Sequence, residues 1–377
     1  MEAIDPKVEE AVDTLELNPV TRRRLLSGVG LTSASAAAAA LLAACSSKKS
    51  TTSAAASGVG QFATTPKWNF VFVNHVTTNP FFVPTQYGAA DACALLGCKY
   101  QWTGSDNSVV ADMVNATNAA VSSKADGIAV AVIDTKAFKD PVDKALDAGI
   151  PAVSYNADGA VNNPGTNRLA YIGQDLFTSG VKLGERIASL VSGGDVVGFI
   201  ATPGTLNIQP RIDGAKQAIT TSGKSIKFAE VASGAKLPQE NTTIDAYITG
   251  HPNLKGIFAV DAGSTQNIGQ LVAKHNLKSK GVAAGGFDLV PVTLQAIKQG
   301  NLDFTIDQQP YLQGFLPVLA LFLYKLSGGL VSPPETNTGL LFVTKENVDP
   351  YLTTQSRFEG STTKQQVMNR TGAIAHP

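Results

Sequence analysis

The feature that most constrains the fold is a regular alternation of short apolar runs with segments of helical periodicity. Most runs of strand length are apolar, and most are followed by a segment with apolar residues at helical spacing. This pattern is typical of a parallel sheet whose two faces are both covered by helices. The expected strands are 68–73, 98–102, 127–133 and 150–155, and the expected helices are 81–96, 109–123 and 137–148.

The alternation restarts near residue 169, which predicts a second sheet. The expected strands are 169–172, 195–200, 226–231, 256–260, 281–286 and 304–306, and the expected helices are 176–191, 211–221, 241–249, 265–275 and 290–299. A last helix, 311–326, is apolar on more than one face, as expected for a helix buried between layers. The sequence therefore predicts an α/β fold with two doubly wound parallel-sheet lobes.

The N-terminal region has a pattern that is typical of an export signal. Arg22 and Arg23 precede an uncharged, alanine-rich run that ends in Leu-Ala-Ala-Cys at Cys45. This tetrapeptide resembles a lipobox, which implies cleavage before Cys45 and a lipid thioether on its sulfur. An uncleaved membrane anchor is the alternative, but serines and glycines interrupt the run. Residues 46–65 are small and polar and read as a flexible tether.

Charge and cysteine content narrow the possible functions. The 377 residues carry 30 basic and 30 acidic side chains, so no net field attracts nucleic acid. Besides Cys45 only Cys93 and Cys98 occur, and they could form a disulfide or remain two small buried residues. Without a nearby histidine they do not form a metal site, and we expect neither a metal nor a cofactor.

The motifs of common enzymes are absent from the sequence. No Walker loop occurs, no Gly-x-Gly-x-x-Gly follows a strand, and Gly-x-Ser-x-Gly is missing. Of the four histidines only His75, in the exit loop of the first strand, is a candidate ligand. Asp261 and Asp288 could form a glycosidase acid–base pair, but nothing in the sequence separates their pKa values. We therefore expect no catalytic residue and no enzyme activity.

Amide, carboxyl and aromatic side chains follow the predicted strands, at the edge where open parallel sheets bind ligands. Charge-assisted hydrogen bonds from such groups to the hydroxyls of a neutral polyol contribute ~1.5–3 kcal/mol each. Phenyl rings can cover the C–H face of a sugar, although a phenyl pair at a helix start can also simply fill the core. These exit residues are Asn79, Phe81, Phe82, Asn156, Asp261, Asp288 and Gln308.

Five spaced motifs resemble those of the ribose-binding-protein-like class, the sugar receptors of bacterial ABC importers. They begin with Asn79-Pro-Phe-Phe82 and are spread over about residues 66–345: 79–82, 148–156, 209–214, 285–288 and 306–310. The resemblance implies two lobes joined by a three-strand hinge, with a sugar bound between them. The resemblance also implies which residues bind the sugar, because the matching positions in that class do so: Asn79, Phe81, Phe82, Arg211, Asp288 and Gln308.

The sequence also departs from the ribose-binding pattern. Asn156-Ala157 replaces an Asp-Arg pair, Ala131 or Val132 replaces an Asn, and Asp261-Ala262 replaces Asn-Asp. A related sugar, a sugar alcohol or a furanone-type signal therefore remains an alternative to ribose. Trp102-Thr-Gly104 is similar to the autoinducer-2-binding branch of the class, which makes a signal receptor the second hypothesis.

The resemblance and the export signal together predict the organisation of the chain. The first lobe comprises 66–171 plus 309–334, the second comprises 172–308 plus 335–346, the signal occupies 1–45, and 347–377 is a polar tail. We expect a monomeric, extracytoplasmic lipoprotein, in the periplasm or on the cell membrane, that delivers its ligand to an ABC transporter permease.

Overall fold

A computed structural model describes residues 63–160, 163–329, 332–353, 356–365 and 367. The predicted signal, including Cys45, and the tether up to residue 62 lie outside the described residues. Within the described part of the chain, no helix has the length and apolar character needed to cross a membrane.

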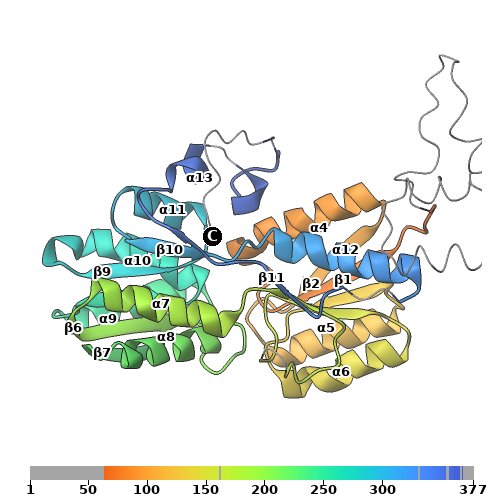
Figure 1. The fold of residues 1–377 in the computed structure, drawn as a ribbon, viewed down its shortest axis with the longest axis horizontal. Helices are drawn as coiled ribbons and strands as arrows, with labels where there is room; N and C mark the ends of the chain where they lie inside the picture. The colour runs from red at the N-terminus through yellow and green to blue at the C-terminus, as the bar shows by residue number, and fades with distance from the viewer. Residues whose placement is uncertain (1–62, 161–162, 330–331, 354–355, 366, 368–377) are drawn as a thin grey trace, which may run out of the picture. The chain divides into compact units, whose positions relative to one another are not determined.

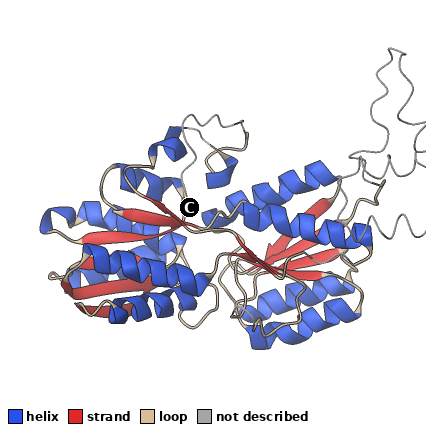
Figure 2. Ribbon diagram, in the orientation of Figure 1, coloured by secondary structure: helices blue, strands red, loops and turns tan. Residues whose placement is uncertain are grey.

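The first lobe is a parallel six-stranded sheet with helices on both faces (Figures 1 and 2). The strand order is β11-β5-β4-β3-β1-β2, so the chain winds outward in both directions from β1. Its strands are β1 (Asn69–Asn74), β2 (Lys99–Gly104), β3 (Gly127–Val130), β4 (Ala152–Tyr155), β5 (Tyr171–Gly173) and β11 (Glu335–Asn337). Its helices are η1 (Pro80–Phe82), α4 (Val83–Leu96), α5 (Val110–Ser122), α6 (Thr135–Asp147) and α12 (Leu312–Ser327).

The second lobe repeats this plan with the order β12-β10-β9-β8-β6-β7, in which only β12 runs antiparallel to its neighbour. Its strands are β6 (Gly193–Ile200), β7 (Ser225–Ala232), β8 (Gly256–Ala259), β9 (Ala283–Phe287), β10 (Phe304–Asp307) and β12 (Leu341–Val343). Its helices are α7 (Leu176–Leu190), α8 (Gln209–Thr221), α9 (Leu237–Gly250), α10 (Ala262–Lys274), η2 (Lys278–Lys280) and α11 (Pro291–Lys298). The predicted fold class is confirmed.

Three crossings connect the lobes, at residues 174–175, 308–311 and 338–340, as the three-strand hinge requires. The predicted lobe boundaries need a small correction at two of them. β5 pairs with β4 and β11 pairs with β5, so 172–173 and 335–337 belong to the first sheet. The polar sequence Glu-Thr-Asn of β11 has no apolar pattern, which is why the sequence did not reveal this strand.

Close packing of α7 against α8 holds one predicted site residue in place. A Cβ atom at Gly180 would lie 2.2 Å from the carbonyl oxygen of Arg211, and one at Gly214 would lie 2.3 Å from that of Phe177. Only glycine permits this separation of the two helix backbones. Arg211, in the first turn of α8, is thereby fixed relative to the sheet.

The C-terminal segment is more structured than the polar tail that the sequence predicted. Val348 is fully buried, and α13 (Asp349–Thr353) packs against α11 of the second lobe. The helix η3 (Arg357–Glu359) packs against α4 of the first lobe, where Arg357 forms two hydrogen bonds with Asp91 (3.0 and 2.8 Å). These anchors are single residues without periodicity, so pattern analysis does not detect them.

Candidate functional site

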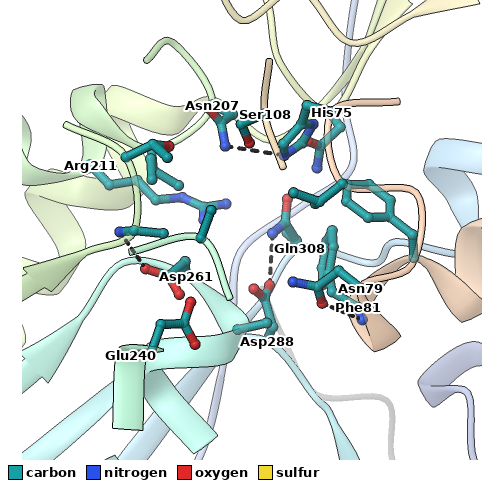
Figure 3. A pocket seen from close by; sticks show the side chains of 18 residues that line it. His75, Asn79, Phe81, Ser108, Asn207, Arg211, Glu240, Asp261, Asp288 and Gln308 are labelled. Atoms are coloured by element: carbon teal, nitrogen blue, oxygen red, sulfur yellow. Dashed lines mark hydrogen bonds between the residues drawn. The ribbon is translucent and has the colours of Figure 1, made fainter. Parts of the chain in front are cut away.

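One cavity gathers all eight ligand-binding residues predicted from the sequence (Figure 3). It lies at the carboxyl ends of β1 and β6, next to the switch points of the two sheets, where open α/β sheets bind ligands. The cavity encloses about 60 Å³. Because one buried water needs roughly 10–15 Å³, this space suits a single small molecule and not a chain of sugar rings.

The first lobe contributes an aromatic and uncharged wall. The Asn79 side-chain oxygen accepts a hydrogen bond from the Phe81 amide (3.0 Å) and caps η1, which leaves its amide nitrogen directed into the cavity (Figure 3). The rings of Phe81 and Phe82 are 4.6 Å apart and nearly perpendicular. Phe82, 1% exposed, also contacts Trp102 in the core behind it, whereas Phe81 is 7% exposed. Phe81 is therefore the ring more available to a ligand.

The second lobe contributes Arg211, which is buried and fixed by several contacts. Its two terminal nitrogens donate to the Val260 carbonyl (2.8 Å) and to the Gln174 side chain (2.9 Å). The guanidinium lies 4.0 Å from the centre of the Phe287 ring. Its Nε–H is buried and has no hydrogen-bond partner among the residues that the structure describes. A buried donor without a partner costs ~1–3 kcal/mol, so this atom is a ready binding point for a ligand oxygen.

A chain of amides connects the hinge with the cavity. Asn156 donates to Gln313 (3.0 Å), Gln313 donates to Gln308 (3.1 Å), and Gln308 donates to a carboxylate oxygen of Asp288 (2.7 Å). Asn156 and Asp288 both adopt left-handed backbone conformations, with φ of 63° and 78°. Such conformations are uncommon outside glycine and are best tolerated by Asn and Asp. One hydrogen bond therefore links the carboxylate of Asp288, which lines the cavity, to Gln308 at the hinge.

Two more carboxyl groups line the second-lobe wall. Asp261 caps α10 and accepts hydrogen bonds from the amides of Ser264 (2.8 Å) and Ala201 (3.1 Å). Glu240 on α9 is 2% exposed, and sequence analysis did not identify it. Burial raises the pKa of Glu240 to about 9, and the nearby Asp261 adds to this effect. Burial also raises the pKa of Asp288 to about 7, although Arg211 and Gln308 oppose the shift.

A polar contact crosses the cavity between the lobes. His75, after β1, lies 3.2 Å from the side-chain nitrogen of Asn207 in the loop after β6. Burial lowers the pKa of His75 to about 3, so the imidazole is neutral at physiological pH. The Leu206 amide also donates to the Ile133 carbonyl (3.1 Å) of the first lobe. In this structure the lobes are thus in contact around the cavity.

Several sequence features do not belong to the lining. Trp102, which suggested a signal receptor, stacks on Phe72, is partly buried against the core and does not line the cavity. Ala131 and Val132 are fully buried and contribute no polar group. Cys93 and Cys98 are free thiols in this structure. Among the described residues, no group of three or more His, Cys, Asp or Glu is arranged to hold a metal ion.

Comparison with known proteins agrees with this geometry. Residues 70–328 match the model of the periplasmic binding protein domain. The chain belongs to the periplasmic binding protein family. It is 52% identical over 325 residues to the xylose/arabinose-binding protein XylF of Sulfolobus acidocaldarius, an alignment that covers 83% of this chain and 80% of that protein.

Solved structures show the same arrangement. An ABC transporter solute-binding protein of Burkholderia graminis, in complex with D-arabinose, superimposes with a TM-score of 0.68 at 26% identity, covering 74% of this chain and 96% of that one. A carbohydrate transporter from Acidothermus cellulolyticus, in complex with myo-inositol, gives a TM-score of 0.68 at 27% identity, covering 79% and 100%. The relatives are binding and transport proteins, which confirms the expectation of a binding protein and not an enzyme.

Proposed function

We propose that this protein captures one molecule of a pentose such as xylose or arabinose between its lobes and delivers it to an ABC transporter. The observation that carries the proposal is the convergence of Asn79, Phe81, Arg211 and Asp288 on one small cavity, with one Arg211 donor unpaired among the described residues. The names of the 52% identical relative and of the arabinose-bound structure support the choice of a pentose.

The two walls divide the recognition of the sugar between them. Phe81 covers the apolar face of the ring, while Arg211 Nε and the Asn79 amide donate to its oxygens. Asp288 and Asp261 accept from its hydroxyl groups. A handful of such bonds, after the cost of ordering, supports micromolar affinity or better, which corresponds to ~8 kcal/mol.

Calorimetry with D-xylose, L-arabinose, D-ribose and myo-inositol tests this proposal. We expect xylose or arabinose to bind unchanged at micromolar or lower concentration. At 100 times the Kd, the ligand adds ~2.7 kcal/mol to stability. Small-angle scattering shows a smaller radius of gyration with saturating sugar if the lobes close. The proposal of a pentose ligand fails if neither xylose nor arabinose binds, and the closure mechanism fails if a sugar binds without compaction.

The proposal includes a lipid anchor at Cys45 and export through the arginine pair. It also includes action as a monomer at the outer face of the cell membrane or in the periplasm. The lipobox-like sequence and membership of a periplasmic family support this part. Cys45→Ser removes the thiol needed for the thioether, so we expect membrane fractionation to show release of the variant. Cys98→Ser is the control, and equal membrane retention of Cys45→Ser and wild type contradicts the anchor.

The same assay tests the export route. Arg22→Lys combined with Arg23→Lys keeps the charge but removes the arginine pair, and we expect precursor to accumulate inside the cell. Normal export of this double variant means that the pair is not read as a twin-arginine signal.

A further inference from the structure

Glu240 is a carboxyl group in the cavity without a basic partner. It is 2% exposed, and no Lys, Arg or His nitrogen in the described part of the chain forms a salt bridge with it. Its hydrogen-bond partner is the side-chain nitrogen of Asn267, at 3.3 Å. An ionised carboxylate with so little compensation is strongly disfavoured in a buried site, and such a group takes up a proton instead.

The fold holds Glu240 at the cavity by specific contacts. Asn267 on α10 also donates to the Leu237 carbonyl (3.1 Å) and accepts from Asn241 (3.0 Å), which fixes its amide orientation. A Cβ atom at Gly263 would lie 2.2 Å from one carboxyl oxygen of Glu240 and 2.6 Å from the other. The absence of a side chain at residue 263 therefore makes room for this carboxyl group.

Asp261 and Glu240 face each other but differ in their ability to carry charge (Figure 3). Asp261 accepts two backbone amides at the N-terminus of α10, where the helix dipole also favours an anion. Glu240 also lies in the first turn of a helix, α9, but within the described part of the chain its carboxyl group accepts a hydrogen bond only from the side-chain amide of Asn267. When two carboxyl groups share a site, one of them keeps a proton, and these contacts assign the proton to Glu240.

We propose that Glu240 is a specificity-determining residue of the sugar site, which stays protonated and donates a hydrogen bond to a ligand oxygen while Asp261 accepts one from a ligand hydroxyl. This inference rests on the proposed function and adds a second donor to the wall that contains Arg211. Glu240 and Asp261 together then recognise a ligand that presents a hydrogen-bond acceptor next to a hydrogen-bond donor. Neighbouring hydroxyl groups of a sugar have this arrangement.

The other ionisable groups around the cavity leave this assignment intact. From the second lobe these are Arg211 on α8, Asp261 and Asp288; from the first lobe His75, which is neutral; and at the start of α9 the exposed Lys236. Arg211 is bonded to Val260 and Gln174, and Asp288 to Gln308. Burial raises the pKa of Glu240 to about 9, and burial also raises the pKa of Asp261, so the Glu240→Gln variant is needed to assign an alkaline titration to Glu240.

Calorimetry with D-xylose and L-arabinose from pH 7 to pH 10 at constant ionic strength tests the proposal. For wild type we expect the affinity to change by no more than about twofold between pH 7 and pH 9, as Asp288 completes its ionisation, and to weaken by an amount that approaches tenfold per pH unit above pH 9. Glu240→Gln keeps a donor and cannot ionise, so its affinity at pH 7 stays within about threefold of wild type and its alkaline loss disappears. Glu240→Ala loses the donor and binds at least tenfold more weakly at pH 7. Glu185→Gln, on the surface, follows wild type throughout.

Equal pH profiles for wild type and Glu240→Gln, or full affinity of Glu240→Ala, overturn the proposal. A measurement without sugar tests the protonation of Glu240 independently of the proposed function. Carboxyl ¹³C NMR of glutamate-labelled protein, with the resonance assigned by its loss in Glu240→Gln, reports the protonation of Glu240 directly. A titration near pH 9 supports the proton assignment even if neither pentose binds, and a titration below pH 6 refutes it.

Discussion

The wall from the first lobe is aromatic and uncharged, whereas the wall from the second lobe contains three carboxyl groups and a guanidinium. Phe81 and Phe82 sit in an apolar core and contribute to folding as well as to the cavity. Arg211, Glu240 and Asp288 are buried ionisable groups, which are costly in a folded protein. The first wall thus provides a complementary shape without lowering the stability of the fold. The second wall provides directional hydrogen bonds, and its buried ionisable groups lower that stability. Variants of the second wall should accordingly show the larger effects on binding and all of the pH dependence.

The largest effect is expected at Arg211. Arg211→Lys keeps the positive charge but removes the planar fork that reaches Val260, Gln174 and the cavity together. We expect calorimetry to show a loss of ~2 kcal/mol or more in sugar binding, which is about 30-fold. Lys182→Arg, on an exposed face of α7, is the control. Unchanged affinity would mean that the unpaired Nε–H does not bind the ligand.

The hydrogen bonds of Arg211 also determine how much stability the protein should lose when Arg211 is replaced by alanine. A surface arginine in the first turn of a helix contributes little to stability. Here Arg211 is 2% exposed and forms two hydrogen bonds, so Arg211→Ala lowers the unfolding temperature even without sugar. Arg211→Lys loses the same hydrogen bonds but keeps the charge and most of the side chain, so we expect a smaller loss of stability and a cleaner measure of binding than with Arg211→Ala.

On the first wall, Phe81→Ala should weaken binding by removing the apolar surface that covers the sugar ring. Burial of a phenyl ring is worth ~1.5–3 kcal/mol, and only part of this is shared with the ligand, so we expect roughly tenfold weaker binding. Phe177→Ala, whose ring is exposed, serves as control. If Phe81→Ala binds sugar normally and only unfolds at lower temperature, Phe81 is a core residue and the first wall has no role in recognition.

The pH dependence below neutrality should come from the second wall alone. Because burial raises the pKa of Asp288 to about 7, acidification converts an acceptor of sugar hydroxyls into an acid. We expect the Kd to rise as the pH falls from 8 to 6, by up to tenfold per unit, and Asp288→Asn to bind weakly at every pH. A wild-type Kd that is constant between pH 6 and pH 8 would show that Asp288 does not accept from the ligand.

The same raised pKa has the opposite consequence for folding without sugar. The folded protein holds this proton more tightly than the unfolded chain does. The contribution of Asp288 to stability is therefore present below about pH 4 and is lost as the pH rises towards 7. Denaturant unfolding of wild type and Asp288→Asn across this range measures the difference.

The sequence was most informative where side chains follow strands. Parallel strands end at one edge, so Asn79, Asp261, Asp288 and the hinge residue Gln308 could be grouped without a structure. Glu240 was missed because it lies inside a helix, where a polar residue ordinarily faces solvent. Gln313 was missed for a similar reason. It lies in the largely apolar sequence of α12, where nothing in the pattern indicates that its amide joins Asn156 to Gln308.

The smallest effect is expected at the contact between the two walls. The hydrogen bond between neutral His75 and Asn207 is worth ~1 kcal/mol, and it forms only when the lobes approach each other. His75→Ala removes it, so we expect about fivefold weaker sugar binding and a larger radius of gyration of the sugar-free protein. His251→Ala is the control, because that exposed imidazole stacks on Tyr247 of the same lobe. Since a ligand shifts an equilibrium only by its differential contacts with the two forms, the variant should still close at saturating sugar. A sugar-free radius of gyration equal to that of wild type would mean that this contact does not bias the balance between open and closed forms.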